Sequence, residues 1–204
     1  MSASNTIISA NANASQPSLY QHGHEIQTYG SLRNMPIALS SNARSESCDL
    51  VNQILADTII LYHLYKKHHW LMRGHTFYQL HLLLDKHASE QIELIDALGE
   101  RVQTLGGVAI ADPRHVAEVT KIKRPPNGVE EIPMMLSRLL EAHELIIGEL
   151  RETILVPRRF ANDKTATNQD SGTNDLVVSQ ILRTNELQVW FLAEHLVDTP
   201  LVRS

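Results

Sequence analysis

The stretch from Lys67 to Gly107, KHHWLMRGHTFYQLHLLLDKHASEQIELIDALGERVQTLGG, is the most informative part of this chain. It holds five side chains that bind metal ions well, in the order His69, His81, Asp85, Asp96 and Glu100. In an ideal helix the last four point roughly 0, 40, 60 and 100° around one axis, so they share a face. Asp85 and Asp96 lie about 16 Å apart along it, too far for one ion with ligand bonds of about 2 Å.

The helix therefore carries two incomplete sites. A break at residues 74–76 lets the chain reverse, which returns His69 to the beginning of the next helix. We name two groups: the histidine half-site is His69, His81 and Asp85, and the acidic half-site is Asp96 and Glu100. A two-fold dimer in which each histidine half-site faces the partner's acidic half-site would complete both, because isologous contacts come in identical pairs. The sequence predicts a metal site between subunits.

The same stretch resembles the ferroxidase segment of the Dps proteins, the miniature ferritins of starved bacteria. The family's ligands are a His before a Trp, a His and an Asp one turn apart, and an Asp and a Glu one turn apart. They fall without a gap on His69, His81, Asp85, Asp96 and Glu100, and further matches are Trp70, Gly74, Phe77, Arg101 and Gly106. A weaker resemblance covers roughly residues 45–197.

This resemblance implies an all-α, ferritin-like four-helix bundle with a short extra helix between its second and third helices. It implies a homo-oligomer, a hollow dodecamer, that oxidises Fe(II) at its dimer interfaces and stores ferric mineral inside. Hydrogen peroxide is the family's usual oxidant, with O2 as the other, and the reaction protects against oxidative stress. The two half-sites are then both the catalytic residues and the iron ligands.

Composition favours a compact intracellular protein. With 204 residues, 43% of them hydrophobic, one domain with a real core is expected. Cys48 is the only cysteine, which fits a reducing, cytoplasmic compartment. The net charge of −5 gives no electrostatic reason to bind nucleic acid or acidic lipid. The apolar stretch 54–64 is too short to cross a bilayer, so no membrane association is expected.

The chain divides into two parts. Residues 1–44 are predicted to be a flexible N-terminal tail, and residues 45–204 the ferritin-like domain. The expected helices begin at Ser45 or Ser47 and end at about 73, run over 77–105 after a cap at Thr76, over 113–119, from the 125–128 break to 155, and over 175–197. Residues 157–174 are predicted to be a polar loop, longer than a bundle normally needs.

Two other iron or DNA functions can be compared with the sequence. A larger ferritin or bacterioferritin builds its di-iron centre from Glu-x-x-His motifs, and the chain contains none. A nucleoid-associated protein needs several cations to neutralise phosphates. Residues 1–44 offer only Arg33 and Arg44, and the C-terminus only Arg203. A small basic patch at Arg158, Arg159 and Lys164 remains, so DNA binding is expected to be weak or absent.

Two histidines outside the half-sites extend the metal hypothesis. His195, in the last predicted helix, is a further candidate metal ligand, and an added imidazole would shift a site towards Zn(II). Zinc is therefore the alternative metal. His87 points roughly 200° away from Asp85 around the helix, so it is not expected to join Asp85 in one site.

Overall fold

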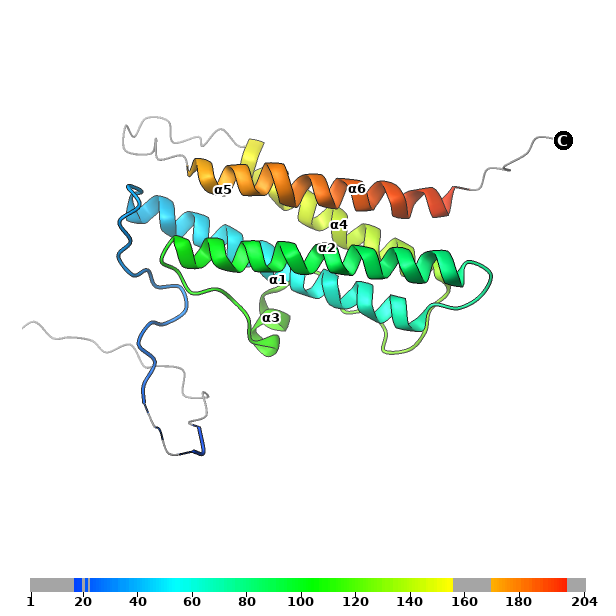
Figure 1. Ribbon diagram of the computed structural model, residues 1–204, viewed down its shortest axis with the longest axis horizontal. Helices are drawn as coiled ribbons and strands as arrows, with labels where there is room; N and C mark the ends of the chain where they lie inside the picture. The colour runs from blue at the N-terminus through cyan, green and yellow to red at the C-terminus, as the bar shows by residue number, and fades with distance from the viewer. Residues whose placement is uncertain (1–16, 20, 22, 156–169, 198–204) are drawn as a thin grey trace, which may run out of the picture.

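The structure is a computed structural model that describes residues 17–19, 21, 23–155 and 170–197. Its elements are α1 (Ser41–Leu71), α2 (Phe77–Thr104), α3 (Pro113–Val119), α4 (Ile132–Leu155), α5 (Ser171–Leu176), the π-helix η1 (Val177–Leu182), α6 (Arg183–Ala193) and the 3-10 helix η2 (Glu194–Leu196). Long helices α1, α2 and α4 run side by side with a fourth rod made of α5, η1 and α6 (Figure 1). The predicted four-helix bundle with a short extra helix, α3, is confirmed, and the described ranges contain no strand.

Aliphatic side chains fill the centre of the bundle. On α2, Leu80, Leu84 and Leu98 are at most 1% exposed, and Ile54 on α1 and Leu139 on α4 are fully buried. Such apolar residues recur every three or four positions, which gives each helix one face for the core. Truncating one of them to alanine costs about 2–5 kcal/mol. This core packs together the helices that carry the two half-sites.

The first helix begins earlier than predicted. α1 starts at Ser41, and the hydroxyl of Ser40 caps it by accepting a hydrogen bond of 3.2 Å from the main-chain N–H of Ala43. The prediction of a start at Ser45 or Ser47 is wrong because Ser40 offers the same capping chemistry five residues before Ser45.

The segment before α1 is also bound to the bundle, so residue 44 is not the boundary of a free tail. Gln27 donates a hydrogen bond to the carbonyl of Gly106, and so does the main-chain N–H of Arg33, both at 2.9 Å. The buried Arg44 guanidinium donates to the carbonyls of Arg33 at 2.8 Å and Leu105 at 3.0 Å. The end of α2 thereby anchors the stretch that precedes α1.

The second and third helices begin and end nearly where the sequence predicts. α2 ends at Thr104, and Gly106 follows with a φ of +87°. Two main-chain bonds, from Gly107 to Val102 and from Gly106 to Gln103, close the helix in a Schellman arrangement. The Asp112 carboxylate caps α3 by accepting from the N–H groups of Arg114 and His115, as predicted. The expected cap at Thr76 forms no side-chain hydrogen bond.

The fourth rod begins at Ser171 rather than Asp175, because Asp170 accepts a hydrogen bond from the N–H of Thr173 and so caps it. Most of the predicted 157–174 loop lies outside the described residues, and its basic patch at Arg158, Arg159 and Lys164 lies there too. In the part of the chain that the structure describes, no helix is long and apolar enough to cross a membrane.

Candidate metal centre

The turn between α1 and α2 brings His69 and His81 together. Gly74, in the turn, has a φ of +93°, a conformation that side chains with a Cβ rarely adopt. The two imidazole rings stack with their centroids 3.8 Å apart and their planes 17° from parallel. The chain reversal expected from the sequence is therefore present, and it pairs the histidines from two different helices.

Hydrogen bonds hold both rings in the tautomer that a metal ligand needs. His69 Nδ1 lies 2.7 Å from the carbonyl oxygen of His81, and His81 Nδ1 lies 3.0 Å from that of His69. A carbonyl oxygen only accepts, so each Nδ1 carries the proton and each Nε2 keeps a free lone pair. In metal sites, hydrogen bonds with neighbouring groups usually orient the histidine ligands, and here two main-chain carbonyls have this role.

Asp85 joins this pair from one turn further along α2. Its Oδ1 lies 3.9 Å from His69 Nε2, and it also accepts a hydrogen bond of 2.6 Å from Lys66 Nζ. The Lys66 hydrogen bond holds the pKa of Asp85 below its ordinary value, and the Lys66 charge adds to the effect. The Lys66 ammonium neutralises this carboxylate in the metal-free subunit.

The acidic half-site is separate. Asp96 and Glu100 are exposed and line a groove of about 700 Å³ between α1, α2 and residues 109–111. The walls of this groove are mostly apolar: Leu55, Ile59, Ile95, Ala109, Ile110 and Ala111. The described residues contain no group of three or more His, Cys, Asp or Glu side chains placed to hold one metal ion. The described part of one subunit therefore does not place His69, His81 and Asp85 as a three-ligand set, and the shared site stays a prediction.

His195 does not join either half-site in a group of three or more metal-binding side chains in the described part of the subunit. It is exposed and lies on η2, at the end of the fourth rod. Neighbouring Trp190 is 58% exposed and donates a hydrogen bond of 3.2 Å to Glu194. Nothing in the geometry of this subunit adds His195 to the histidine half-site.

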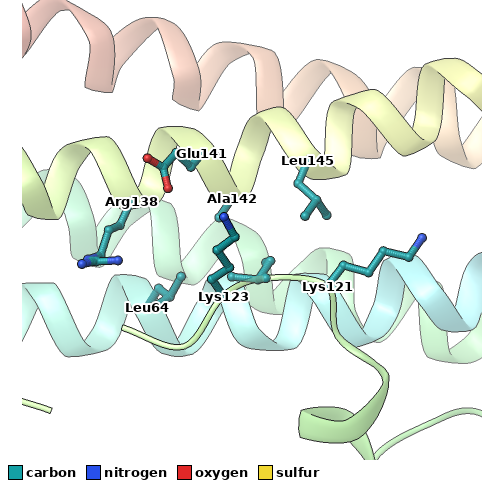
Figure 2. A pocket seen from close by; sticks show the side chains of 8 residues that line it. Leu64, Lys121, Lys123, Arg138, Glu141, Ala142 and Leu145 are labelled. Atoms are coloured by element: carbon teal, nitrogen blue, oxygen red, sulfur yellow. The ribbon is translucent and has the colours of Figure 1, made fainter. Parts of the chain in front are cut away.

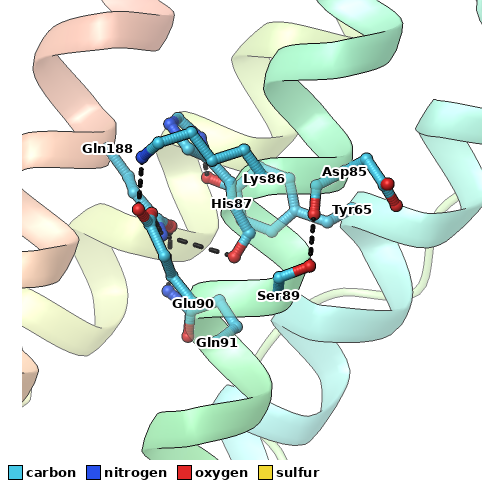
Figure 3. A network of polar contacts seen from close by, with 8 residues as sticks. All are labelled: Tyr65, Asp85, Lys86, His87, Ser89, Glu90, Gln91 and Gln188. Atoms are coloured by element: carbon cyan, nitrogen blue, oxygen red, sulfur yellow. Dashed lines mark hydrogen bonds and ion pairs between the residues drawn. The ribbon is translucent and has the colours of Figure 1, made fainter.

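A buried polar network in the middle of the bundle was not expected from the sequence. Its fully or almost fully buried members are Tyr65 on α1, His87 and Gln91 on α2, His143 on α4, and Asn185 and Gln188 on α6. Figure 3 shows the part around Gln188, whose amide nitrogen donates to Glu90 at 2.8 Å, while Gln91 donates to Gln188 at 2.9 Å. A histidine at an otherwise apolar helix position, as at 143, is the signal that could have found it.

A smaller cavity of about 230 Å³ lies between α1, α4 and the chain that enters α4 (Figure 2). Three of its lining side chains are cationic: Lys121, Lys123 and Arg138. Two of the three are already neutralised, because Lys121 pairs with Glu149 and Arg138 with Glu130. None of the five candidate ligands lines this cavity, so it is not part of the metal centre.

The chain and its structure are similar to several known proteins. The family model described as ferritin-like domain matches residues 48–202. The structure of DpsC from Streptomyces coelicolor is 62% identical, superposes with a TM-score of 0.80, and is aligned over 88% of this chain and 100% of its own. A protein from the bpoA2 5' region of Kitasatospora aureofaciens is 62% identical over 138 residues, 68% of this chain and 92% of that protein. A DNA protection during starvation protein of Halobacterium salinarum is 36% identical over 60% of this chain and 68% of its own length.

Proposed function

Because the chain belongs to the Dps family of ferritin-like proteins, we propose that it is a ferroxidase. In this proposal it oxidises Fe(II) with hydrogen peroxide or O2 at sites shared by two subunits, and it stores the ferric product inside a hollow homo-oligomer. The resemblance makes that oligomer a dodecamer. The observation that carries the proposal is the division of five candidate ligands into two incomplete sets, with His69 on α1 and the other four along α2.

The arrangement of α2 supports a two-fold completion of both sets. His81 and Glu100 are equally far from the middle of the helix at residues 90–91, and so are Asp85 and Asp96. When two copies of α2 pack antiparallel about a two-fold axis at that point, His81 lies opposite the partner subunit's Glu100. Asp85 then lies opposite the partner subunit's Asp96. A single axis produces two identical sites.

Exposed apolar side chains support the same contact. Leu82 and Ile92 are each 49% exposed and Tyr78 is 69% exposed, all on α2. Ideal helix geometry places Ile92 about 20° from His81 around the axis, between the two half-sites. Trp70, at the end of α1, is 72% exposed. A contiguous apolar surface around polar groups is typical of a protein interface, and a second copy of this chain fits it.

The donor set suits iron as a substrate that arrives, is oxidised and leaves. Imidazole and carboxylate both bind Fe(II), and the harder Fe(III) prefers oxygen ligands. The two histidines provide nitrogen ligands for Fe(II). With only three carboxylates, the site releases Fe(III) to the oxygen-rich mineral. Fe(II) gives one electron to the oxidant, and hydrogen peroxide takes up two. Lys66 neutralises the charge of Asp85 when no iron is bound, and the iron cation takes over this role when it binds.

DNA binding is not part of the proposed function. Among the first 44 residues the only cations are Arg33 and Arg44, and Arg44 is 6% exposed with its guanidinium bound to main-chain carbonyls. The cations around the smaller cavity are largely paired with carboxylates. Affinity for duplex DNA at physiological salt requires several free cations on one surface. We therefore expect weak DNA binding or none.

A complementation experiment tests the shared site directly. One variant carries His81→Ala and Asp85→Ala, and the other carries Asp96→Ala and Glu100→Ala. Each should be inactive alone. In a mixed dimer, one of the two sites takes both of its half-sites from the unmutated parts and is intact.

Unfolding and random reassembly of the two variants together should restore Fe(II) oxidation, with about a quarter of the sites intact. Stopped-flow absorbance of the ferric product gives the readout. Each variant reassembled by itself is the matched control. Absence of recovery in mixed oligomers of normal size would refute a site shared between subunits.

A further inference from the structure

A phenol and an imidazole form a short hydrogen bond at the centre of the bundle. Tyr65 Oη on α1 lies 2.5 Å from His143 Nε2 on α4, and both side chains are completely buried. Buried polar groups are costly unless they are hydrogen-bonded, and a hydrophobic pair would fill the same space without that cost. The proposed ferroxidase reaction does not use either residue.

The surrounding hydrogen bonds fix the direction of this contact. Asn185 donates from Nδ2 to the carbonyl of Ile181 at 2.7 Å, so its Oδ1 is free to accept from His143 Nδ1, also at 2.7 Å. His143 therefore carries its proton on Nδ1, and its Nε2 accepts the Tyr65 hydroxyl. His87 Nδ1 lies 3.2 Å from the same hydroxyl oxygen and can donate to it. The phenol proton of Tyr65 therefore already points at the unprotonated Nε2 of His143.

Neither partner is charged at neutral pH. Burial raises the pKa of Tyr65 well above its ordinary value, and the nearby Glu90 charge adds to this. Burial lowers the pKa of His143 to about 3. Ordinary acid–base chemistry is thus blocked, because proton transfer would create two buried charges. Removal of an electron changes this balance, since an oxidised phenol is a strong acid and its proton loss leaves a neutral radical.

Tyr65 and His143 are close to the histidine half-site, on its core side. Tyr65 precedes His69 by one turn of α1, a rise of about 6 Å. On α2, His87 follows Asp85 by two residues and points into the core towards Tyr65. The phenol is therefore close to the place where Fe(II) meets its oxidant, while protein on all sides keeps it from solvent. The two tryptophans, Trp70 and Trp190, are both mostly exposed.

We propose that Tyr65 is a redox-active residue that gives one electron to a strong one-electron oxidant while its hydroxyl proton moves to His143 Nε2. The oxidant is of the hydroxyl-radical class, formed when Fe(II) reduces hydrogen peroxide by one electron, so this step rests on the proposed function. The O–H bond of Tyr65 breaks and an N–H bond of His143 forms. The products are a neutral phenoxyl radical, a protonated His143 and hydroxide.

A further Fe(II) then returns an electron to Tyr65, and His143 returns the proton. The net change is oxidation of one Fe(II) and reduction of one hydroxyl radical to hydroxide, with the protein restored. Tyr65 thus prevents the oxidant from attacking the shell. Asn185 acts as a positioning residue, because its Oδ1 holds the proton of His143 on Nδ1.

The first experiment uses the iron-free protein, so it does not depend on ferroxidase activity. A photogenerated ruthenium(III) tris-bipyridine oxidises the whole protein, and freeze-quenched electron paramagnetic resonance detects the product. We expect a phenoxyl signal that narrows when the tyrosines are ring-deuterated and that shows a nitrogen coupling from imidazole in pulsed measurements. Tyr65→Phe should remove this signal and His143→Gln should remove the nitrogen coupling, whereas the matched control Tyr62→Phe on the same helix should keep both.

The second experiment adds Fe(II) and hydrogen peroxide and measures hydroxyl-radical spin adducts for each Fe(II) oxidised. Tyr65→Phe should release more adduct than wild type, and Tyr62→Phe the same amount. A phenoxyl signal that survives in Tyr65→Phe, or one that lacks the imidazole coupling in wild type, would overturn the proposal. The wild-type coupling decides the question even if Tyr65→Phe does not fold. Failure of iron oxidation with a normal Tyr65 radical would refute the ferroxidase proposal alone.

Discussion

His69 and His81 bind each other through their main chains: each ring donates its Nδ1 proton to the carbonyl oxygen of the other residue. This reciprocal pair joins the end of α1 to the beginning of α2 and leaves the Nε2 atom of each ring out of the two bonds. The turn that reverses the chain and the orientation of the ligands are therefore fixed by the same two hydrogen bonds. Metal binding requires little further ordering of these side chains, which favours affinity.

The tautomers of these histidines give the first prediction. At neutral pH, nitrogen-15 solid-state spectra of the metal-free oligomer should show His69 and His81 protonated on Nδ1, assigned through single His→Gln variants. Addition of Zn(II) as a redox-inert probe should shift the two Nε2 resonances and leave the Nδ1–H resonances in place. Protonation on Nε2 in the metal-free protein would contradict the reciprocal pair.

The proposed two-fold contact predicts that a charge at its centre prevents assembly. Ile92→Lys places an ammonium beside the axis, where the partner's Ile92 variant brings a second one, and like charges across a contact repel. The wild-type protein should sediment as one closed species close to a dodecamer. The variant should sediment as much smaller species and lose Fe(II) oxidation.

The control for this experiment is Val129→Lys, which alters a similarly exposed apolar side chain away from the α2 face. A normal oligomer with Ile92→Lys would mean that the α2 face is not the contact.

Gly106 provides a test of how the segment before α1 is attached. Its φ is +87°, and an added Cβ would lie 2.6 Å from the carbonyl oxygen of Arg33. Gly106→Ala should therefore destabilise the protein by more than about 1 kcal/mol and expose the 27–40 segment to proteolysis. Gly148→Ala, on the exposed side of α4 with nothing near the added Cβ, should instead stabilise by about 0.5–1 kcal/mol. Urea unfolding at equal subunit concentration measures both.

His143 predicts how stability depends on pH. Its pKa is lowered from 6.5 to about 3 in the folded protein because it is buried, so between these values only the unfolded chain binds the proton. Stability from this residue is then complete above about pH 6.5 and falls by about 1.4 kcal/mol per pH unit as the pH decreases towards 3. His143→Leu should be less stable at pH 7, because Tyr65 and Asn185 lose their partner, yet its stability should fall less steeply in acid. Equal slopes for the two proteins would contradict a buried neutral His143.

The charge distribution predicts that the protein does not retard duplex DNA at neutral pH and moderate salt. With a net charge of −5, the surface has no electrostatic reason to attract phosphates. In acid the protein gains positive charge, and weak, salt-sensitive binding is then expected. A gel shift over a series of pH and salt values measures this. Tight, salt-resistant binding at pH 7.5 would refute the prediction.

The four-helix bundle and the order of the five candidate ligands can be predicted from the sequence alone. Apolar residues at helical spacing, the glycines after Thr104 and the Asp112–Pro113 pair specify helices through local physics, and local physics can be read from neighbouring residues. The spacing of His81, Asp85, Asp96 and Glu100 also determined that one helix cannot complete a site, since helix rise and metal–ligand bond lengths are fixed.

Which groups far apart in the sequence come into contact depends on how the helices pack against one another. The attachment of the segment before α1 depends on carbonyls at the end of α2, which no local pattern reveals. The neutralisation of Asp85 by Lys66 requires α1 to lie against α2. The bond between Tyr65 and His143 spans 78 positions of the chain, and it exists because the packing of α1 against α4 leaves these two polar side chains no partner but each other and their buried neighbours.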